Sequence, residues 1–329
     1  MQHELREAEQ ALLHYSFDNP IIDFIRHNEN MTFKITTPAD NRRYVLRIHK
    51  SVADGLSGQQ HTWDGLHAEM LFLQTIGQAN VLNVQKPVAN LAGGMITEYI
   101  SDRHGPTYAT LLEWIDGSTL TLQEEDAERI VYRLGQNVAK LHRFLQSSPP
   151  LELRRPAYDA DRIDEALVEL RIGASGGVIA PEDLTVIEEV LATVKLQLAE
   201  LDAREGSKGY VHADFQLGNI IVSEEEGSPS LIDFGLFGHG YYLFDLGSAC
   251  SMLKPELRKT FLDGYASQTA FASDDIRYIE GQIFMDIFIS YVFVIHHPGK
   301  NQWIKADAAN VCSTLAPDFL AGREVLYAF

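Results

Sequence analysis

Cysteine is scarce in this chain, since Cys250 and Cys312 are the two in 329 residues. A disulfide framework needs more cysteines than this, so the composition excludes a small disulfide-stapled secreted scaffold and favours a reducing compartment. The first residues, "MQHELREAEQALLHYSF", also lack the apolar core of a signal peptide. We therefore expect a cytoplasmic protein.

Basic residues are also under-represented. Lys and Arg number 27 against 46 Asp and Glu, which gives a formal net charge of −19. Binding to a phosphate backbone relies on clustered Lys and Arg, so this balance argues against a nucleic-acid partner. It suits a cationic small molecule, although acidity also serves simply to keep a protein soluble.

Long hydrophobic runs are missing too. The most apolar stretch, "GQIFMDIFISYVFVIHH", is interrupted by Asp286 and falls short of the roughly 20 apolar residues that span a bilayer. We expect a buried helix there and no membrane partner. With 45% hydrophobic and 22% charged residues, the chain has the composition of a globular protein, and its length predicts two domains or lobes.

The first third of the chain has a strand-rich pattern. After an N-terminal helix, "MTFKITTP" and "RRYVLRIHK" predict a hairpin with Asp40 and Asn41 in its turn. "WDGLHAEMLFLQTI" has helical spacing, and "GGMITEYI" and "TYATLLEWIDG" return to strand composition. The expected order is helix, strand, strand, helix, strand, strand.

The pattern becomes helical from Leu122, with Gly117 as a candidate hinge. Three helices are expected in "LQEEDAERIVYRLGQNVAKLHRFLQ", "DRIDEALVELR" and "PEDLTVIEEVLATVKLQLAEL", the last two separated by "GASGG". No internal repeat or low-complexity tract is present.

The chemistry is concentrated in "VHADFQLGNIIV" (residues 211–222) and in "SLIDFG" after it. The intervening "SEEEGSPS" is typical of a hairpin turn, so we expect Asp214, Asn219 and Asp233 to lie close together at strand ends. Such oxygen ligands suit Mg²⁺ bound to phosphate. The simpler alternative is a buried hairpin whose polar residues only cap turns, but the spacing of four polar positions before "DFG" favours the site.

"HADFQLGN" and "IDFG" resemble the H-x-D-x-x-x-x-N and I-D-[FW]-x signatures of the aminoglycoside phosphotransferase and choline kinase group, which is related to protein kinases. The resemblance implies an α+β, two-lobed protein-kinase-like fold. It has an N-terminal antiparallel sheet lobe with one key helix (1–113), a hinge (114–117) and a larger, mainly helical C-terminal catalytic and substrate-binding lobe (118–329).

The resemblance also implies roles for the motif residues. Asp214 would be the catalytic base, Asn219 and Asp233 would bind Mg²⁺, and His212 would brace the catalytic loop. "WIDG" resembles the end of the family's hinge, where backbone groups from Glu113 to Ile115 would meet the adenine.

In the first lobe, "YVLRIHK" corresponds to the family's phosphate-binding Lys strand but offers Arg47, and Glu69 in "HAEMLFL" takes the place of its partner. Arg keeps the charge but is bulkier than Lys and not equivalent to it, and the two residues could equally form an ordinary strand-to-helix ion pair. A second departure is "RHNENMTF", which lacks the spaced glycines of a nucleotide loop and carries Asn28 and Asn30.

Two further expectations concern acidic residues. Asp245 in "YYLFDLGSA" is interpreted as a helix-start carboxylate that caps backbone amides. A ring of acids in the second lobe would hold an amine-bearing acceptor, although each taken singly is more typical of a solvated helix face: Asp159, Asp161, Asp164, Glu280 and Asp286.

The sequence thus predicts an ATP- and Mg²⁺-dependent kinase that phosphorylates a hydroxyl of a small molecule, with an aminoglycoside or other antibiotic, choline or homoserine as candidates. Two alternatives stay open. One is a protein Ser/Thr kinase of the same group, and the other is a nucleotide-binding regulatory module that has lost turnover. The oligomeric state and the choice between ATP and GTP are not defined by the sequence.

Overall fold

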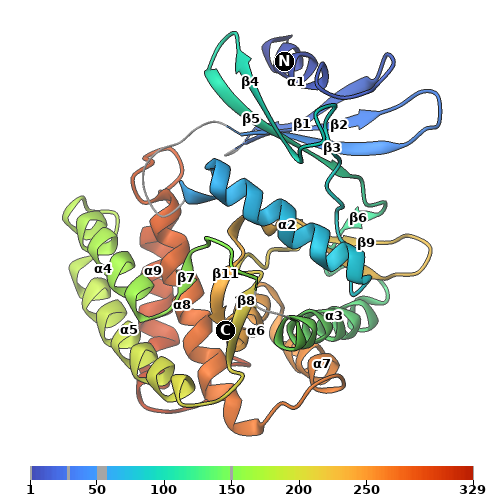
Figure 1. The fold of residues 1–329 in the computed structure, drawn as a ribbon. Coiled ribbons are helices and arrows are strands. Elements are labelled where there is room, and N and C mark those ends of the chain that lie inside the picture. The colour runs from blue at the N-terminus through green and yellow to red at the C-terminus, as the bar shows by residue number, and fades with distance from the viewer. Residues whose placement is uncertain (1, 28–29, 50–57, 149–150, 329) are drawn as a thin grey trace. The chain divides into compact units, whose positions relative to one another are not determined.

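The computed structural model describes residues 2–27, 30–49, 58–148 and 151–328 (Figure 1). The chain divides into two compact units. The first comprises Met1–Ser118, Glu152–Arg155 and Ser230–Gly235, and the second Thr119–Leu151, Pro156–Pro229 and Leu236–Phe329. The fold is α+β, with an antiparallel sheet in the N-terminal part and a mainly helical remainder, as expected. Asp233 belongs to the first unit, whereas Asp214 and Asn219 belong to the second.

The first unit is built on a five-stranded sheet of order β1-β2-β3-β5-β4 in which all neighbours are antiparallel. Its elements are α1 (Gln2–Leu12), β1 (Ile21–His27), β2 (Asn30–Thr36), β3 (Arg43–His49), α2 (Trp63–Ala79), β4 (Ile96–Ser101) and β5 (Gly105–Glu113). The expected hairpin is β2–β3, and Asn41 lies in its turn with a φ of 54°. Strand β1 was not expected from the sequence.

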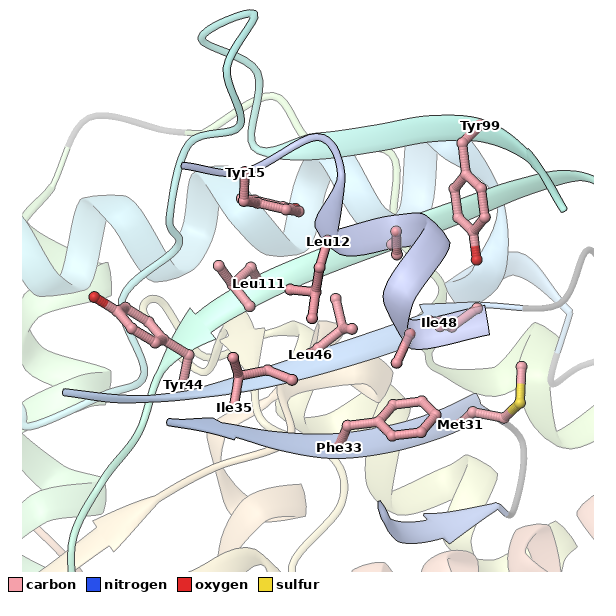
Figure 2. Close-up of a cluster of buried hydrophobic side chains, with 13 residues drawn as sticks. Leu12, Tyr15, Met31, Phe33, Ile35, Tyr44, Leu46, Ile48, Tyr99 and Leu111 are labelled. Atoms are coloured by element: carbon pink, nitrogen blue, oxygen red, sulfur yellow. The ribbon is translucent and has the colours of Figure 1, made fainter. Parts of the chain in front are cut away.

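Helix α1 covers one face of this sheet because alternate residues of β2, β3 and β5 are apolar. Leu12 of α1 packs in one buried cluster with Phe33, Leu46 and Leu111 (Figure 2). The residues between these apolar ones, such as Arg47, therefore project from the opposite face of the sheet, because successive side chains in a strand alternate between its two faces. Helix α2 begins after Thr62, whose Oγ1 accepts a hydrogen bond from the N–H of Gly65.

The second unit is mainly helical. Its helices are α3 (Ala127–Ser147), α4 (Ala160–Ser175), α5 (Pro181–Asp202), α6 (Tyr242–Met252), α7 (Pro255–Ala266), α8 (Ile276–Val294), α9 (Ile304–Thr314) and α10 (Ala316–Leu320). A small sheet sets β11 (Gly238–Tyr241) between β7 (Ala157–Tyr158) and β8 (Lys208–Val211). The other short strands are β6 (Ser118–Thr119), β9 (Ile220–Val222) and β10 (Pro229–Leu231).

Two helix boundaries differ from the expectation. Helix α3 begins at Ala127 rather than near Leu122, because Leu122 has φ of 60°, which is incompatible with a right-handed helix. Helix α4 continues to Ser175, so the first three residues of "GASGG" are helical and the link to α5 lies at 176–180.

The most apolar stretch of the sequence forms α8, which is buried along most of its length, as expected. Across the described part of the chain, every helix is too short or too polar to span a lipid bilayer.

Candidate active site

The loop between β8 and β9 fixes Asp214 through hydrogen bonds on both carboxylate oxygens. Gln216 Nε2 donates to Oδ1 at 2.7 Å, and Asn219 Nδ2 donates to Oδ2 at 2.8 Å. The N–H of Asp214 donates to Nδ1 of His212, which is 1% exposed. The half-buried carboxylate is thus held in one orientation by amide donors. The buried His212 contacts the backbone of Asp214, as a histidine with a structural role would.

Asn219 is buried and lies in a short 3₁₀ turn, Leu217–Asn219. Its side-chain amide nitrogen donates to both the backbone carbonyl and the carboxylate of Asp214, at 3.0 and 2.8 Å. Because the nitrogen is committed in this way, the amide oxygen Oδ1 is left to accept a cation or a donor. The structure therefore brings together two of the three residues expected at strand ends.

Asp245, which the sequence analysis interpreted as a helix cap, has another role. It lies within α6, is 0% exposed, and accepts backbone N–H groups from the loop between β8 and β9. The N–H of Ala213 donates to Oδ1, and the N–H of His212 donates to Oδ2, both at 2.9 Å. Ala213 has φ of 60°, a region that a non-glycine residue rarely adopts, so Asp245 holds a strained loop residue in place.

A buried histidine supports Asp245 in turn. His142 of α3 lies with Nε2 2.9 Å from Oδ2 of Asp245 and Nδ1 3.0 Å from the hydroxyl of Tyr265. Burial raises the pKa of Tyr265 above its usual range, so its hydroxyl stays protonated. This network joins α3, α6 and α7 behind the loop that carries Asp214.

In the first unit, Arg47 of β3 and Glu69 of α2 form the expected ion pair. It is bidentate: Nη1 donates to Oε1 at 2.9 Å and Nη2 to Oε2 at 3.0 Å. Nε of Arg47 donates to Thr110 Oγ1 at 3.2 Å. Arg47 is buried, and the Glu69 charge keeps the pKa of its guanidinium raised despite desolvation. Fork-to-fork pairing of this kind fixes geometry as well as charge.

Asp233 accompanies this pair in the first unit. Its Oδ1 lies 3.8 Å from Arg47 Nη1, and its Oδ2 accepts from Arg26 Nη2 at 3.3 Å. Asp233 has φ of 62°. Phe234, the residue after Asp233, is buried, and its ring is tilted against Phe72 of α2 with 5.9 Å between centroids, so it anchors the chain next to Asp233.

The expected hinge residues follow β5. The N–H of Glu113 donates to the carbonyl of Lys86 at 2.8 Å, and the N–H of Trp114 donates to the carbonyl of Arg43 at 3.0 Å. Ile115 lies beyond the strand, and its N–H donates to no residue in the described part of the chain. Of the expected adenine contacts, Ile115 therefore has a free backbone donor, whereas that of Glu113 is already used.

Most acids of the expected acceptor-binding ring are engaged elsewhere. Asp159 caps α4 by accepting the N–H of Asp161, and Asp164 pairs with Lys195 at 2.6 Å. Glu280 accepts two backbone N–H groups of the C-terminal segment, at 2.5 and 2.7 Å. Asp161 is exposed. Asp159, Asp164 and Glu280 are thus engaged by contacts other than those of the β8–β9 loop.

Asp286 of α8 differs from the other four. Ser251 Oγ donates to its Oδ2 at 3.3 Å, and Ser248 also donates to its carboxylate. Ser248 Oγ in turn lies 3.4 Å from the N–H of Phe215, the residue after Asp214. Burial raises the pKa of Asp286 to about 6. A half-buried acid is thus linked by two hydrogen bonds, through Ser248, to the backbone of the β8–β9 loop.

The donor types fit a hard divalent cation. Mg²⁺ takes carboxylate and amide oxygens and completes its coordination with water and phosphate. Asn219 offers an Oδ1 that accepts from no residue in the described ranges, and Asp233 offers a part-exposed carboxylate that pairs with Arg26 and lies near Arg47. The residues expected to hold Mg²⁺ therefore have the right chemistry on each unit.

Comparison with known proteins places this geometry in context. A model of the phosphotransferase enzyme family matches residues 22–278. No curated protein sequence matches the chain significantly.

Solved structures resemble the whole chain. A microcompartment-associated aminopropanol kinase has a TM-score of 0.76 at 20% identity, covering 97% of this chain and 98% of its own. Amicoumacin kinase hAmiN, in complex with AMP-PNP, Ca²⁺ and Ami, has a TM-score of 0.75 at 17% identity, covering 98% and 94%. A choline kinase from Cryptosporidium parvum Iowa II has a TM-score of 0.62 at 16% identity, covering 93% and 90%. These likenesses establish the fold, and it is the two-lobed kinase-like fold expected from the motifs.

Proposed function

We propose that this protein transfers the γ-phosphoryl group of ATP to a hydroxyl of a small, amine-bearing molecule in the presence of Mg²⁺. The chain belongs to the phosphotransferase enzyme family and is a kinase with an alcohol group as acceptor. The observation that carries the proposal is the fixed carboxylate of Asp214 in a loop with the family's spacing to Asn219. The resemblance to kinases of amino alcohols and antibiotics supports the class of acceptor.

Asp214 acts as the general base in this proposal. Its carboxylate accepts the proton of the acceptor hydroxyl as the oxygen forms a bond to the γ-phosphorus, while the bond to the β-phosphate oxygen breaks and ADP leaves. Because amide donors from Gln216 and Asn219 fix the carboxylate, little reorganisation is needed when the acceptor binds.

The remaining expected residues bind the nucleotide. Asn219 Oδ1 and the Asp233 carboxylate would hold Mg²⁺, which neutralises phosphate charge when bound. Arg47, fixed by Glu69, contributes a positive charge, and the free N–H of Ile115 is available to the adenine.

Asp286 is the group proposed to bind the acceptor amine. It lies beside the catalytic loop through Ser248, and its carboxylate is ionised at pH 7 because its raised pKa is still about 6. An ammonium group placed there would pair with a partly desolvated charge, which strengthens such a contact relative to one in water.

Replacement of the base is the direct test of the function. Asp214→Asn should reduce kcat by about 10²-fold or more, with the affinity for ATP and Mg²⁺ nearly unchanged, because the amide cannot accept the proton. The measurements are ADP release and calorimetric ATP titration. Asp202→Asn, a half-exposed carboxylate in the same unit, is the matched control and should retain activity. Substantial turnover by Asp214→Asn would contradict the assigned role.

Acceptor identity requires a panel. We expect ADP release with some amino alcohols, aminoglycosides or other amine-bearing hydroxyl compounds, and none with the corresponding amines that lack the hydroxyl. Phosphate appearing only on protein substrates would instead favour a protein kinase. Stabilisation by ATP and Mg²⁺ without ADP release on any acceptor would favour a regulatory module.

A further inference from the structure

A row of polar side chains crosses the sheet of the first unit. Strand pairing aligns Arg26 with Thr32, Thr32 with Arg47, and Arg47 with Thr110. Directly paired residues project from the same face of a sheet. Arg26 therefore shares a face with Arg47, opposite the face that α1 covers.

A β-bulge is the reason that Arg26 faces this way. Phe24 pairs with Phe33, but Arg26 pairs with Thr32, so the register shifts by one residue at Ile25. Without the shift, Arg26 would follow Ile22 and Phe24 toward the apolar core under α1. Bulges commonly re-aim a side chain beside an active site. This one brings a second arginine onto the face of Arg47.

The two arginines differ in what they have left to offer. Arg47 is committed to Glu69 through both Nη atoms and to Thr110 through Nε, and its side chain is 7% exposed. Arg26 is 46% exposed and pairs with Asp233, whose side chain is 31% exposed. The Arg47 charge is balanced within a buried pair, so Arg26 is the cation of this cluster that can change partners.

We propose that Arg26 is a phosphate-binding residue. Without nucleotide it balances the charge of Asp233. Asp233 would hold the metal of a metal–nucleotide complex, and Arg26 would then be free to pair with the β- and γ-phosphate oxygens. The inference rests on the proposed function, and it adds a second phosphate-binding cation to Arg47, whose guanidinium is already paired with Glu69. Guanidinium groups suit this role because they bind phosphate oxygens bidentately.

Nucleotide binding tests the inference without turnover. Arg26→Gln should weaken binding of ATP with Mg²⁺ by about tenfold or more, measured by calorimetry, while AMP, which lacks the β- and γ-phosphates, binds within about twofold of the wild type. Arg26→Lys keeps the charge and should restore part of the ATP affinity. In kinetics, the KM for ATP should rise in Arg26→Gln more than kcat falls.

Arg103→Gln is the matched control, because Arg103 is an exposed arginine of the same unit, in the turn between β4 and β5. It should leave ATP and AMP binding unchanged. Equal loss of ATP and AMP affinity in Arg26→Gln would indicate a structural role and overturn the inference, as would wild-type ATP affinity. In both cases the proposed function would stand, whereas failure of the wild type to bind ATP at all would overturn the function itself.

Discussion

At the scale of one residue, the burial of Asp286 sets the pH range in which its carboxylate can bind a cation. Burial raises the pKa of its carboxyl from the ordinary value of 3.8 to about 6, and the nearby charge of Asp245 acts in the same direction. The carboxyl is therefore half protonated near pH 6, mostly neutral a unit below it and mostly charged a unit above it. A group that binds an ammonium ion can do so only in its charged form.

This pKa predicts a pH dependence for the acceptor. As the pH falls from about 7.5 to 5.5, the KM for an amine-bearing acceptor should rise by about threefold or more, because most of Asp286 becomes protonated. Asp286→Asn should raise this KM at pH 7.5 and flatten its pH dependence, with the KM for ATP unchanged. Steady-state kinetics at the two pH values measures both effects. An unchanged acceptor KM in Asp286→Asn would remove Asp286 from the acceptor site.

Sequence patterns identified residues whose partners lie nearby in a recognisable motif, and missed those whose partners are distant. The spacing from Asp214 to Asn219 was sufficient to predict their proximity, and the strand-to-helix order predicted the Arg47–Glu69 pair. Asp245 was misinterpreted because a carboxylate early in a helix is a common cap, whereas its partners are backbone groups 32 and 33 residues away.

At the scale of elements, close helix packing depends on two glycines. Figure 1 shows α3 and α7 side by side, and they are in extensive contact. A Cβ added at Gly135 would lie 2.1 Å from the carbonyl oxygen of Phe261, and one at Gly264 would lie 2.0 Å from that of Tyr132. Each contact is with backbone, so it cannot be relieved by a side-chain rotation.

Gly264→Ala should therefore lower the free energy of unfolding by about 2–4 kcal/mol, since the helices must separate to admit the methyl group. Urea unfolding followed by circular dichroism measures the change. Gly77→Ala in α2 is the control: its Cβ would meet the nearest atom at 3.5 Å, so alanine should be neutral or stabilising by about 0.5–1 kcal/mol. Equal stability of the two variants would contradict the packing argument.

In strand β1, the sequence pattern does not predict which face of the sheet each side chain occupies. In "IIDFIRH", strict alternation puts Ile22, Phe24 and Arg26 on one face. The bulge at Ile25 breaks this alternation, and its position depends on pairing with β2 rather than on any residue of β1. The sequence therefore gave no sign that Arg26 shares a face with Arg47.

At the scale of the whole molecule, the net charge of −19 acts over distances longer than any single contact. A negative field attracts cationic ligands, and salt screens it, with a Debye length of about 10 Å at 0.1 M. Raising KCl from about 20 to 200 mM should therefore lower kcat/KM for an amine-bearing acceptor. A neutral alcohol acceptor assayed in parallel is the control and should change little. A salt-independent kcat/KM for the amine would show that the overall charge has no part in acceptor capture.

The membership of two short, distant segments in the first unit could not be foreseen from the sequence, because compact units are defined by contacts and not by order. Expected boundaries assigned all residues from 118 onward to the second lobe, whereas the first unit also takes Glu152–Arg155 and Ser230–Gly235. Arg155 contributes to this by donating to the carbonyls of Gly65 and Gly235. The motif spacing to Asp233 was recognisable, but the unit it joins was not.

That division has a consequence for synthesis on the ribosome. A nascent chain that ends at residue 118 already carries Arg26, Arg47 and Glu69, but not the carboxylate with which Arg26 pairs. The first unit therefore cannot complete its fold while residues 1–118 alone have been made. Its polar cluster is completed only after α3, α4 and α5 have been made and Ser230–Gly235 has emerged.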